Sequence, residues 1–185
     1  NSMRLRIFLA AVAAGFSAPV LADSLDINLN NDSVQAIYAT DWRKAEFNAG
    51  FLSNSDQNDW VASMGLLASG EKQTTDARVE AGLGGKVYIA DVSNKDVLAL
   101  GLGGQFSVHP NNMPIGFGGY LYYAPDVITF MDGKKFWEWG VRAEFEVVKK
   151  TANIYVGYRK VRADLDNNTN VTVDSGGHVG VKISF

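Results

Sequence analysis

The sequence has 185 residues, a formal net charge of −3 and no cysteine. Without cysteine, a disulfide framework and thiolate metal sites are excluded. The mild acidity does not favour nucleic acid as a partner. The length predicts one domain after the N-terminal segment, and no second run of roughly 20 apolar residues predicts a helical membrane span.

Residues 1–22 have the composition of a cleaved signal peptide. Two arginines precede an apolar run over residues 7–15, and Val20-Leu21-Ala22 offers a cleavage site before Asp23. The apolar run is shorter than the roughly 20 residues that a spanning helix needs, which disfavours the alternative of an N-terminal anchor. Because residues 1–2 precede the Met, we expect them to be an upstream remnant.

The chain from Asp23 to Phe185 is expected to form a single β-barrel domain. Segments of alternating apolar and polar residues separated by turns are typical of transmembrane β-barrels. The first four segments are predicted from apolar residues of one parity: Leu25, Ile27 and Leu29; Val34, Ala36 and Tyr38; Phe47, Ala49 and Phe51; and Trp60, Ala62, Met64 and Leu66.

Three further segments share the motif Gly-x-Gly-Gly. No helical periodicity follows any copy, which argues against a dinucleotide-binding turn. Apolar residues keep one parity through each copy, so the first and third glycines are predicted to face the lumen. We therefore expect a nearly side-chain-free inner wall made by Gly82, Gly84, Gly101, Gly103, Gly116 and Gly118.

The last three segments alternate most clearly. Over residues 137–147, tryptophan, valine and phenylalanine share one parity while glutamate, arginine and glycine share the other. Paired tryptophans at one end favour a membrane interface. Short turns near residue 150 suit the periplasmic side, and residues 164–177 are expected to form a long polar extracellular loop.

The inner face is predicted to carry charges of both signs. Buried charges are costly unless paired, so this pattern predicts either a salt-bridged plug or a hydrated passage. The predicted lumen charge network comprises Arg78, Glu80, Lys86, Glu138, Arg142, Glu144, Glu146, Arg159 and Lys182.

The segments predict an all-β, antiparallel transmembrane barrel. Ten strands are counted, with eight as the alternative if the first hairpin lies outside the wall. The chain ends in the alternating residues Val181, Ile183 and Phe185. A terminal phenylalanine in this register is similar to the assembly signal of Gram-negative outer-membrane proteins.

Several blocks of the sequence resemble the YfaZ family. They are residues 23–29, Tyr123-Ala124-Pro125-Asp126, residues 156–162, and residues 176–180 together with the terminal Phe185. The resemblance implies an exported outer-membrane barrel of Gram-negative bacteria. It supplies no catalytic motif and no ligand, so no functional residue can be carried over.

Catalytic and metal-binding patterns are weak. His178 lies near Ser175 and Asp174, but the spacing does not establish a nucleophile and base within hydrogen-bond reach. His109 precedes a turn and is expected to be structural. Asp164, Asp166 and Asn168 begin like a calcium loop, but Thr169 and Ser175 break the pattern. We predict no catalytic, cofactor or metal site.

These observations leave several functions open. A structural barrel with a plugged lumen is the main hypothesis, and a narrow porin-like channel is the second. An outer-membrane enzyme is a third, and a secreted soluble β-sandwich is the alternative outside the membrane class. The expected partners are outer-membrane lipid and lipopolysaccharide, and the barrel-assembly machinery during biogenesis. The oligomeric state is not predicted.

Overall fold

The computed structural model describes residues 22–165 and 169–185, most of which lie in β-strands. The strands are β1 (Ala22–Leu29), β2 (Ser33–Trp42), β3 (Ala45–Asn54), β4 (Trp60–Gln73), β5 (Ala77–Val92), β6 (Lys95–Pro110), β7 (Ile115–Ala124), β8 (Thr129–Met131), β9 (Gly133–Val148), β10 (Ala152–Leu165) and β11 (Asn170–Ser184). One short 3-10 turn, η1 (Asp126–Ile128), precedes β8. No helix among these residues is long and apolar enough to cross a membrane.

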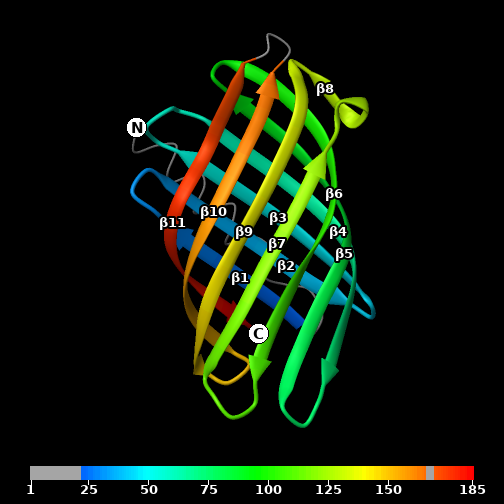
Figure 1. Cartoon of the computed structure of the whole chain (residues 1–185), viewed down its shortest axis with the longest axis vertical. Helices are drawn as coiled ribbons and strands as arrows, with labels where there is room; N and C mark the ends of the chain where they lie inside the picture. Colours follow the sequence, from blue (N-terminus) through cyan, green and yellow to red (C-terminus); the bar gives the residue numbers. More distant parts are fainter. Residues whose placement is uncertain (1–21, 166–168) are drawn as a thin grey trace.

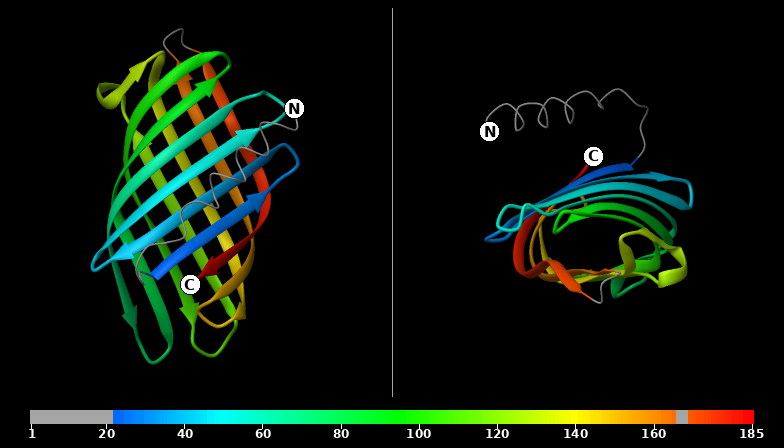
Figure 2. Two further views of the ribbon diagram at one scale, coloured as in Figure 1. Left: turned by 180° about the vertical axis from the view of Figure 1, so that it is seen from behind. Right: turned by 90° about the horizontal axis from the view of Figure 1, so that it is seen from above.

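Ten of these strands form one closed antiparallel barrel. Each pairs with its sequence neighbours, β7 pairs with β9, and β1 pairs with β11 to close the ring. β8 pairs only with β6, over Val97–Ala99, and so supplements one end of the wall. The right-hand view of Figure 2 shows the strands as a flattened ring. The prediction of ten strands is confirmed, and the first hairpin belongs to the wall.

The barrel has a short side and a long side. β1, β2 and β3 have 8 to 10 residues, whereas β5, β6 and β9 each have 16. The start of β1 and the end of β11 lie at the same end, which we call the terminal end; the opposite end is called the far end. At the far end, β5 and β6 are joined by Ser93 and Asn94, both with positive φ, as a tight type I′ hairpin requires.

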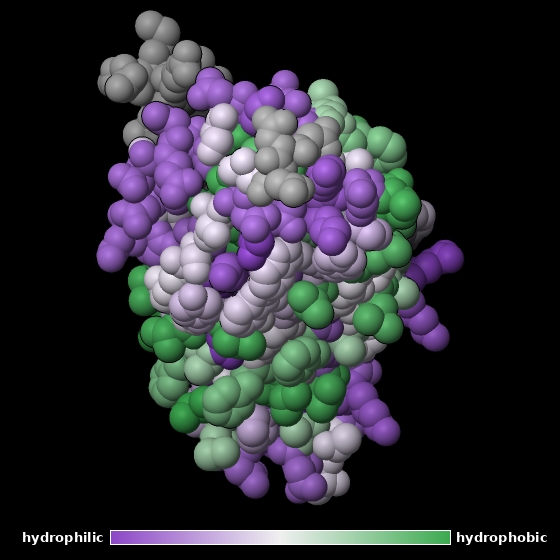
Figure 3. Space-filling view, turned by 45° about the horizontal axis from the view of Figure 1, so that its top comes forward, coloured by the Kyte–Doolittle hydropathy of each residue, from purple (hydrophilic) through white to green (hydrophobic). Residues whose placement is uncertain are grey.

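The outer face is apolar and the inner face is polar, as the alternation predicts. Leu83 is 73% exposed and Met64 is 71% exposed, while Arg159 is fully buried. On the face shown in Figure 3, hydrophobic residues gather around the waist and hydrophilic residues lie at both ends. A soluble sandwich would bury its apolar face and expose its charges, so the sandwich alternative is wrong.

The predicted long loop over residues 164–177 is wrong. β10 extends to Leu165 and β11 begins at Asn170, so the polar residues of this region lie mostly in strands. The pairing register shifts between Val161 and Arg162, which leaves the neighbouring residues Val173 and Asp174 both buried. This β-bulge interrupts the alternation, and the interruption together with Gly176 and Gly177 gave the sequence its loop-like pattern.

Two other sequence predictions fall on residues that the structure leaves undescribed. The signal peptide, residues 1–22, lies outside the described residues except for Ala22, the first residue of β1. Asp166 and Asn168 of the calcium-like pattern also lie outside them. Asp164 lies in β10, where its carboxylate accepts a hydrogen bond from Arg162 Nε at 2.9 Å.

Candidate functional site

The candidate site is the lumen, and its far half is filled by apolar side chains. The strands that surround the lumen are labelled in Figure 1. Small barrels of this kind are filled by inward side chains. Here the buried cluster comprises Leu52, Val61, Leu67, Tyr88, Ala90, Val92, Val97, Ala99, Tyr122, Ala124, Phe136, Val161, Ala163, Leu165 and Val173, which we call the apolar plug.

Arg159 connects β10 with β11, β1 and β2, the next three strands of the ring, beside the apolar plug. Its Nε donates to Asp174 Oδ2 at 2.6 Å, and its Nη2 donates to Ser33 Oγ at 3.1 Å. Its Nη1 donates to the side-chain oxygens of Asn28, at 2.6 Å, and Gln35. Each guanidinium nitrogen therefore has an acceptor, which is the condition for burying a charge.

A second polar cluster lies nearer the terminal end and centres on Glu144. Arg142 Nε lies 2.5 Å from Glu144 Oε1, and Arg142 Nη1 lies 2.9 Å from Asp26 Oδ2. Glu144 Oε2 also accepts from Asn153 Nδ2 at 2.8 Å and lies 3.1 Å from His109 Nε2. This cluster joins β9 to β1, β10 and β6 and fixes His109, which sequence analysis expected to be structural.

The third cluster is at the terminal end of the long side. Arg78 Nη2 donates to Glu146 Oε1 at 2.8 Å, and Arg78 Nε donates to Glu80 Oε1 at 3.1 Å. Glu80 Oε2 accepts from Ser107 Oγ at 3.3 Å. Arg78 and Glu80 belong to β5 and Glu146 belongs to β9, so the Arg78–Glu146 pair connects two strands that are not neighbours in the ring.

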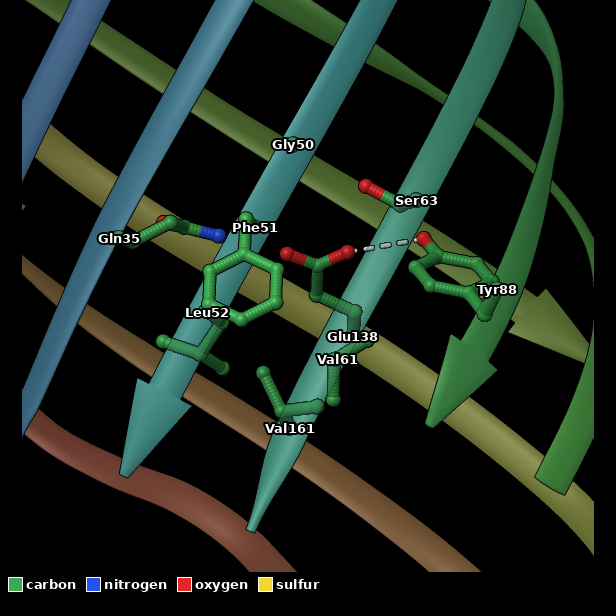
Figure 4. Close-up of a pocket in the computed structure, with 9 residues that line it drawn as sticks. All are labelled: Gln35, Gly50, Phe51, Leu52, Val61, Ser63, Tyr88, Glu138 and Val161. Atoms are coloured by element: carbon green, nitrogen blue, oxygen red, sulfur yellow. Dashed lines mark hydrogen bonds between the residues drawn. The ribbon is translucent and has the colours of Figure 1, made fainter. Parts of the chain in front are cut away.

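Glu138 sits at the inner face of the apolar plug. It is 4% exposed, and its Oε2 accepts a hydrogen bond from Tyr88 Oη at 2.8 Å. Figure 4 shows its carboxylate between the side chains of Gln35 and Tyr88, with Val61 and Val161 below it. The void there has a volume of only about 10 Å³, which is about one water-sized probe. The lumen is thus tightly packed at this level.

A much larger cavity occupies the lumen on the terminal side of this constriction. Its volume is about 550 Å³. Its mouth is lined by residues next to the chain ends and the terminal-end turns, including Ser24, Arg43, Lys150 and Ser184, and its inner end by Tyr120 and Glu138. The lumen is therefore a deep pocket on one side and a packed core on the other.

Two of the predicted lumen cations, both lysines, lack in the described part of the chain the carboxylate partners that the lumen arginines have. Lys86 and Lys182 line the cavity, but neither forms an ion pair or hydrogen bond with a carboxylate among the described residues. Lys86 is 6% exposed, and its Nζ lies 4.4 Å from the centroid of the Tyr122 ring. The structure thus divides the nine predicted charges into paired groups and two cavity lysines without a carboxylate partner.

The glycines do not leave a bare inner wall. Tyr88 covers Gly101, the His109 ring covers Gly116, and Arg142 lies against Gly118. Gly82 lies beside Leu67 and Gln105. The glycines instead provide the space in which large side chains of neighbouring residues lie flat on the wall, so the expected side-chain-free surface is wrong.

Gly84 and Gly103 have a separate reason to be glycine. They pair directly between β5 and β6. A Cβ atom on Gly84 would overlap the Leu66 carbonyl oxygen, and a Cβ on Gly103 would overlap the Leu121 carbonyl oxygen. The wall bends here so closely that only glycine fits, as expected for glycines at barrel corners.

Ser175 and His178 do not form a catalytic pair. Ser175 is exposed, and its Oγ lies 3.0 Å from Oη of the outward-facing Tyr158. His178 is buried and stacks edge-on against Tyr155 at 5.8 Å between ring centroids. Asp174 is bound to Arg159. No group of three or more potential metal ligands occurs within residues 22–165 and 169–185.

The first hairpin contributes lumen residues that were not predicted from the sequence. Asp26 accepts a hydrogen bond from Tyr155 Oη as well as the Arg142 contact, and Asn28 donates to Tyr155 Oη at 3.0 Å. Gln35 accepts from Asn28 at 3.1 Å. Asp26 and Asn28 alternate with Leu25, Ile27 and Leu29, so the period of two could have identified them.

The closed ten-stranded ring, the apolar outer belt and the charged interior define a β-barrel of the outer-membrane type. Within that class the family is also established. The family model described as YfaZ precursor matches residues 3–185, nearly the whole chain, and the protein belongs to the YfaZ family.

Comparisons with curated proteins and with solved structures add no further identification. No curated protein matches the sequence. Among solved structures, the chain is similar to the outer membrane channel DcaP of Acinetobacter baumannii, with 11% identity and a TM-score of 0.38. The match covers 86% of this chain and 54% of the channel, so the chain spans about half the length of that protein.

Proposed function

We propose that this protein is a structural barrel of the Gram-negative outer membrane whose lumen is closed to solutes. The apolar plug carries the proposal. Phe136, Tyr122 and Val97 have no measurable exposure, and the void beside Glu138 holds about 10 Å³. An ion crossing the apolar plug beyond Glu138 would lose its hydration among hydrocarbon side chains, which is strongly unfavourable.

The proposed orientation follows from the lengths of the turns. In barrels of this class short turns face the periplasm, and here every terminal-end connection has two to four residues, whereas the far-end connection from β7 to β9, residues 125–132, has eight. The terminal end is therefore the periplasmic end. The outer belt contacts membrane lipid and lipopolysaccharide, and the assembly machinery reads the end of β11 through Val181, Ile183 and Phe185, which project outward.

The proposal includes no enzymatic activity. The support is geometric, since Ser175 and His178 lie on opposite faces of β11. A lumenal acid–base site would need a nucleophile beside Glu144 or His109. Their contacts are Arg142, Asn153 and each other, and none of these supplies a hydroxyl or thiol nucleophile.

Planar-bilayer recordings on the purified mature chain test the closed lumen. We expect no stable conductance steps above the membrane background. Phe136→Ala combined with Tyr122→Ala removes two fully buried rings of the plug and should produce steps where the native chain gives none. Steady openings of the native protein would refute closure.

A narrow porin-like channel remains the second candidate, because the cavity already spans the terminal side of the lumen. A channel would require the plug to be the gate. If so, the native protein would conduct under voltage, and Val97→Trp, which enlarges the plug, would abolish the current. In the closed barrel neither observation is expected.

A further inference from the structure

The periplasm-facing cavity has the dimensions of a ligand site. Its volume of about 550 Å³ lies within the range of roughly 300–1,000 Å³ that small-molecule pockets occupy. Solute can enter only from the terminal end, because the apolar plug blocks the other side. The charges that line the cavity therefore decide what enters.

One wall of the cavity carries carboxylates that lie directly opposite each other on paired strands. Asp41 of β2 pairs directly opposite Glu46 of β3, and Glu71 of β4 pairs directly opposite Glu80 of β5. Like charges in directly opposed positions are destabilising. All four line the cavity, and among the described residues only Glu80 has an ion-pair partner, Arg78. Glu46 accepts only neutral amide donors, from Asn48 and Gln105. The wall favours a positively charged guest.

The cavity also holds positive groups without carboxylate partners. Lys86 is 94% buried and points over the rings of Tyr122 and Tyr120, at 4.4 and 5.9 Å from their centroids. No described carboxylate lies within ion-pair distance of its Nζ. Lys182 projects from β11, five strands away from β5 in either direction round the ring. The two rings stabilise the ammonium less than an ionic partner would. A buried ammonium without a counter-ion is costly, so Lys86 favours an anionic guest.

Together these observations point to one ligand that carries both charges. We propose that the cavity binds a small zwitterionic solute from the periplasm, of the amino-acid or short-peptide class. Its carboxylate pairs with Lys86 and its ammonium group faces the wall formed by Asp41, Glu46, Glu71 and Glu80. A simple anion would leave the acidic wall unneutralised, and a simple cation would leave Lys86 unpaired. The charge match does not depend on whether the plug is permanently closed, but entry from the periplasm rests on the proposed orientation.

Calorimetric titration of the folded mature chain in detergent micelles tests the charge requirement. The probes are alanyl-alanine, its N-acetyl form, which lacks the cation, and its C-terminal amide, which lacks the anion. We expect the zwitterion to bind with a Kd below about 1 mM. Each blocked form should bind about tenfold or more weakly, the cost of one lost charged contact. Absence of heat for all three probes, or equal affinity for them, would overturn the proposal.

Substitutions identify which end of the ligand Lys86 binds and which end the acidic wall binds. Lys86→Gln should weaken alanyl-alanine and its N-acetyl form by about tenfold or more and leave the amide unchanged. Asp41→Asn should weaken alanyl-alanine and its C-terminal amide, and leave the affinity for the N-acetyl form unchanged. A merely structural effect would weaken all three probes alike, and that outcome would also refute the assignment.

Controls separate misfolding from lost binding. Lys149→Gln removes a cation from the β9–β10 turn that does not line the cavity, and it should bind like the native chain. If Lys86→Gln does not fold, the native chain still tests the assignment through the probes alone. Equal affinity of the native chain for alanyl-alanine and its C-terminal amide would then count against a carboxylate partner in the cavity.

Discussion

Arg159 and Asp174 form an ion pair of 2.6 Å across the β10–β11 ladder, with both side chains almost completely buried. Around it, Asn28, Gln35 and Ser33 accept three further hydrogen bonds from the guanidinium. Because β1 and β2 join β10 and β11 only through the β1–β11 ladder, these bonds reinforce the closure of the ring from inside.

Arg159→Met should therefore destabilise the barrel strongly. Removing one partner of a buried pair costs about 3–5 kcal/mol, because Asp174 is left charged without its counter-ion. Arg162→Met is the control, since the Arg162–Asp164 pair is partly exposed and worth about 0–1 kcal/mol. Urea unfolding in micelles measures both. Adding Asp174→Asn to Arg159→Met should recover part of the loss, and failure to do so would contradict the pairing argument.

Gly103→Ala should prevent normal folding of the β5–β7 wall. The added methyl group would overlap the Leu121 carbonyl oxygen and approach Tyr122 Cα at 2.8 Å, both of them backbone atoms. Gly70→Ala is the matched control, because nothing lies within 4 Å of a Cβ there. The yield of the heat-modifiable folded band on gels compares the two. Equal yields would show that the close approach at Gly103 is not required.

Phe185→Asp should impair assembly in cells more than Lys182→Ala does. Phe185 is 54% exposed on the outer face and continues the row Val181 and Ile183, whereas Lys182 points into the cavity. The backbone of Phe185 also pairs with Asp23 at 2.8 and 2.9 Å, and both substitutions retain these bonds. Quantifying folded protein in the outer-membrane fraction provides the comparison. A larger loss for Lys182→Ala would invalidate the assembly role of the outward row.

A positive charge on the outer face should be costly in proportion to depth. Val141 is 53% exposed near the middle of β9, and Val147 is 56% exposed one residue from its terminal end. Val141→Arg should cost ~2–4 kcal/mol of unfolding free energy in lipid and Val147→Arg about 0–1. Unfolding in lipid vesicles gives both values, with Val141→Ala as the size control. Equal costs would contradict the placement of the membrane around the waist.

Local alternation made most of the fold predictable. In the segment from Trp137 to Val147 every second residue faces outward, and the same rule places Arg159 inside and Val179 outside. This holds because the side-chain direction along a strand has a period of two and depends on nothing beyond the strand. The rule failed at Val173 and Asp174, where a bulge breaks the period.

The lumen partners were decided by the tertiary structure alone. The sequence placed Arg78 and Glu146 on the inner face, but only the registers of all the intervening strands bring their side chains to 2.8 Å. The same registers give Arg159 four hydrogen-bond acceptors and leave Lys86 without a carboxylate partner among the described residues. Parity fixes which face a residue occupies, whereas strand tilt and shear around a closed ring fix its height and its neighbours across the lumen. Whether the interior is plugged, paired or hollow is therefore a property of the closed barrel, which no single strand contains.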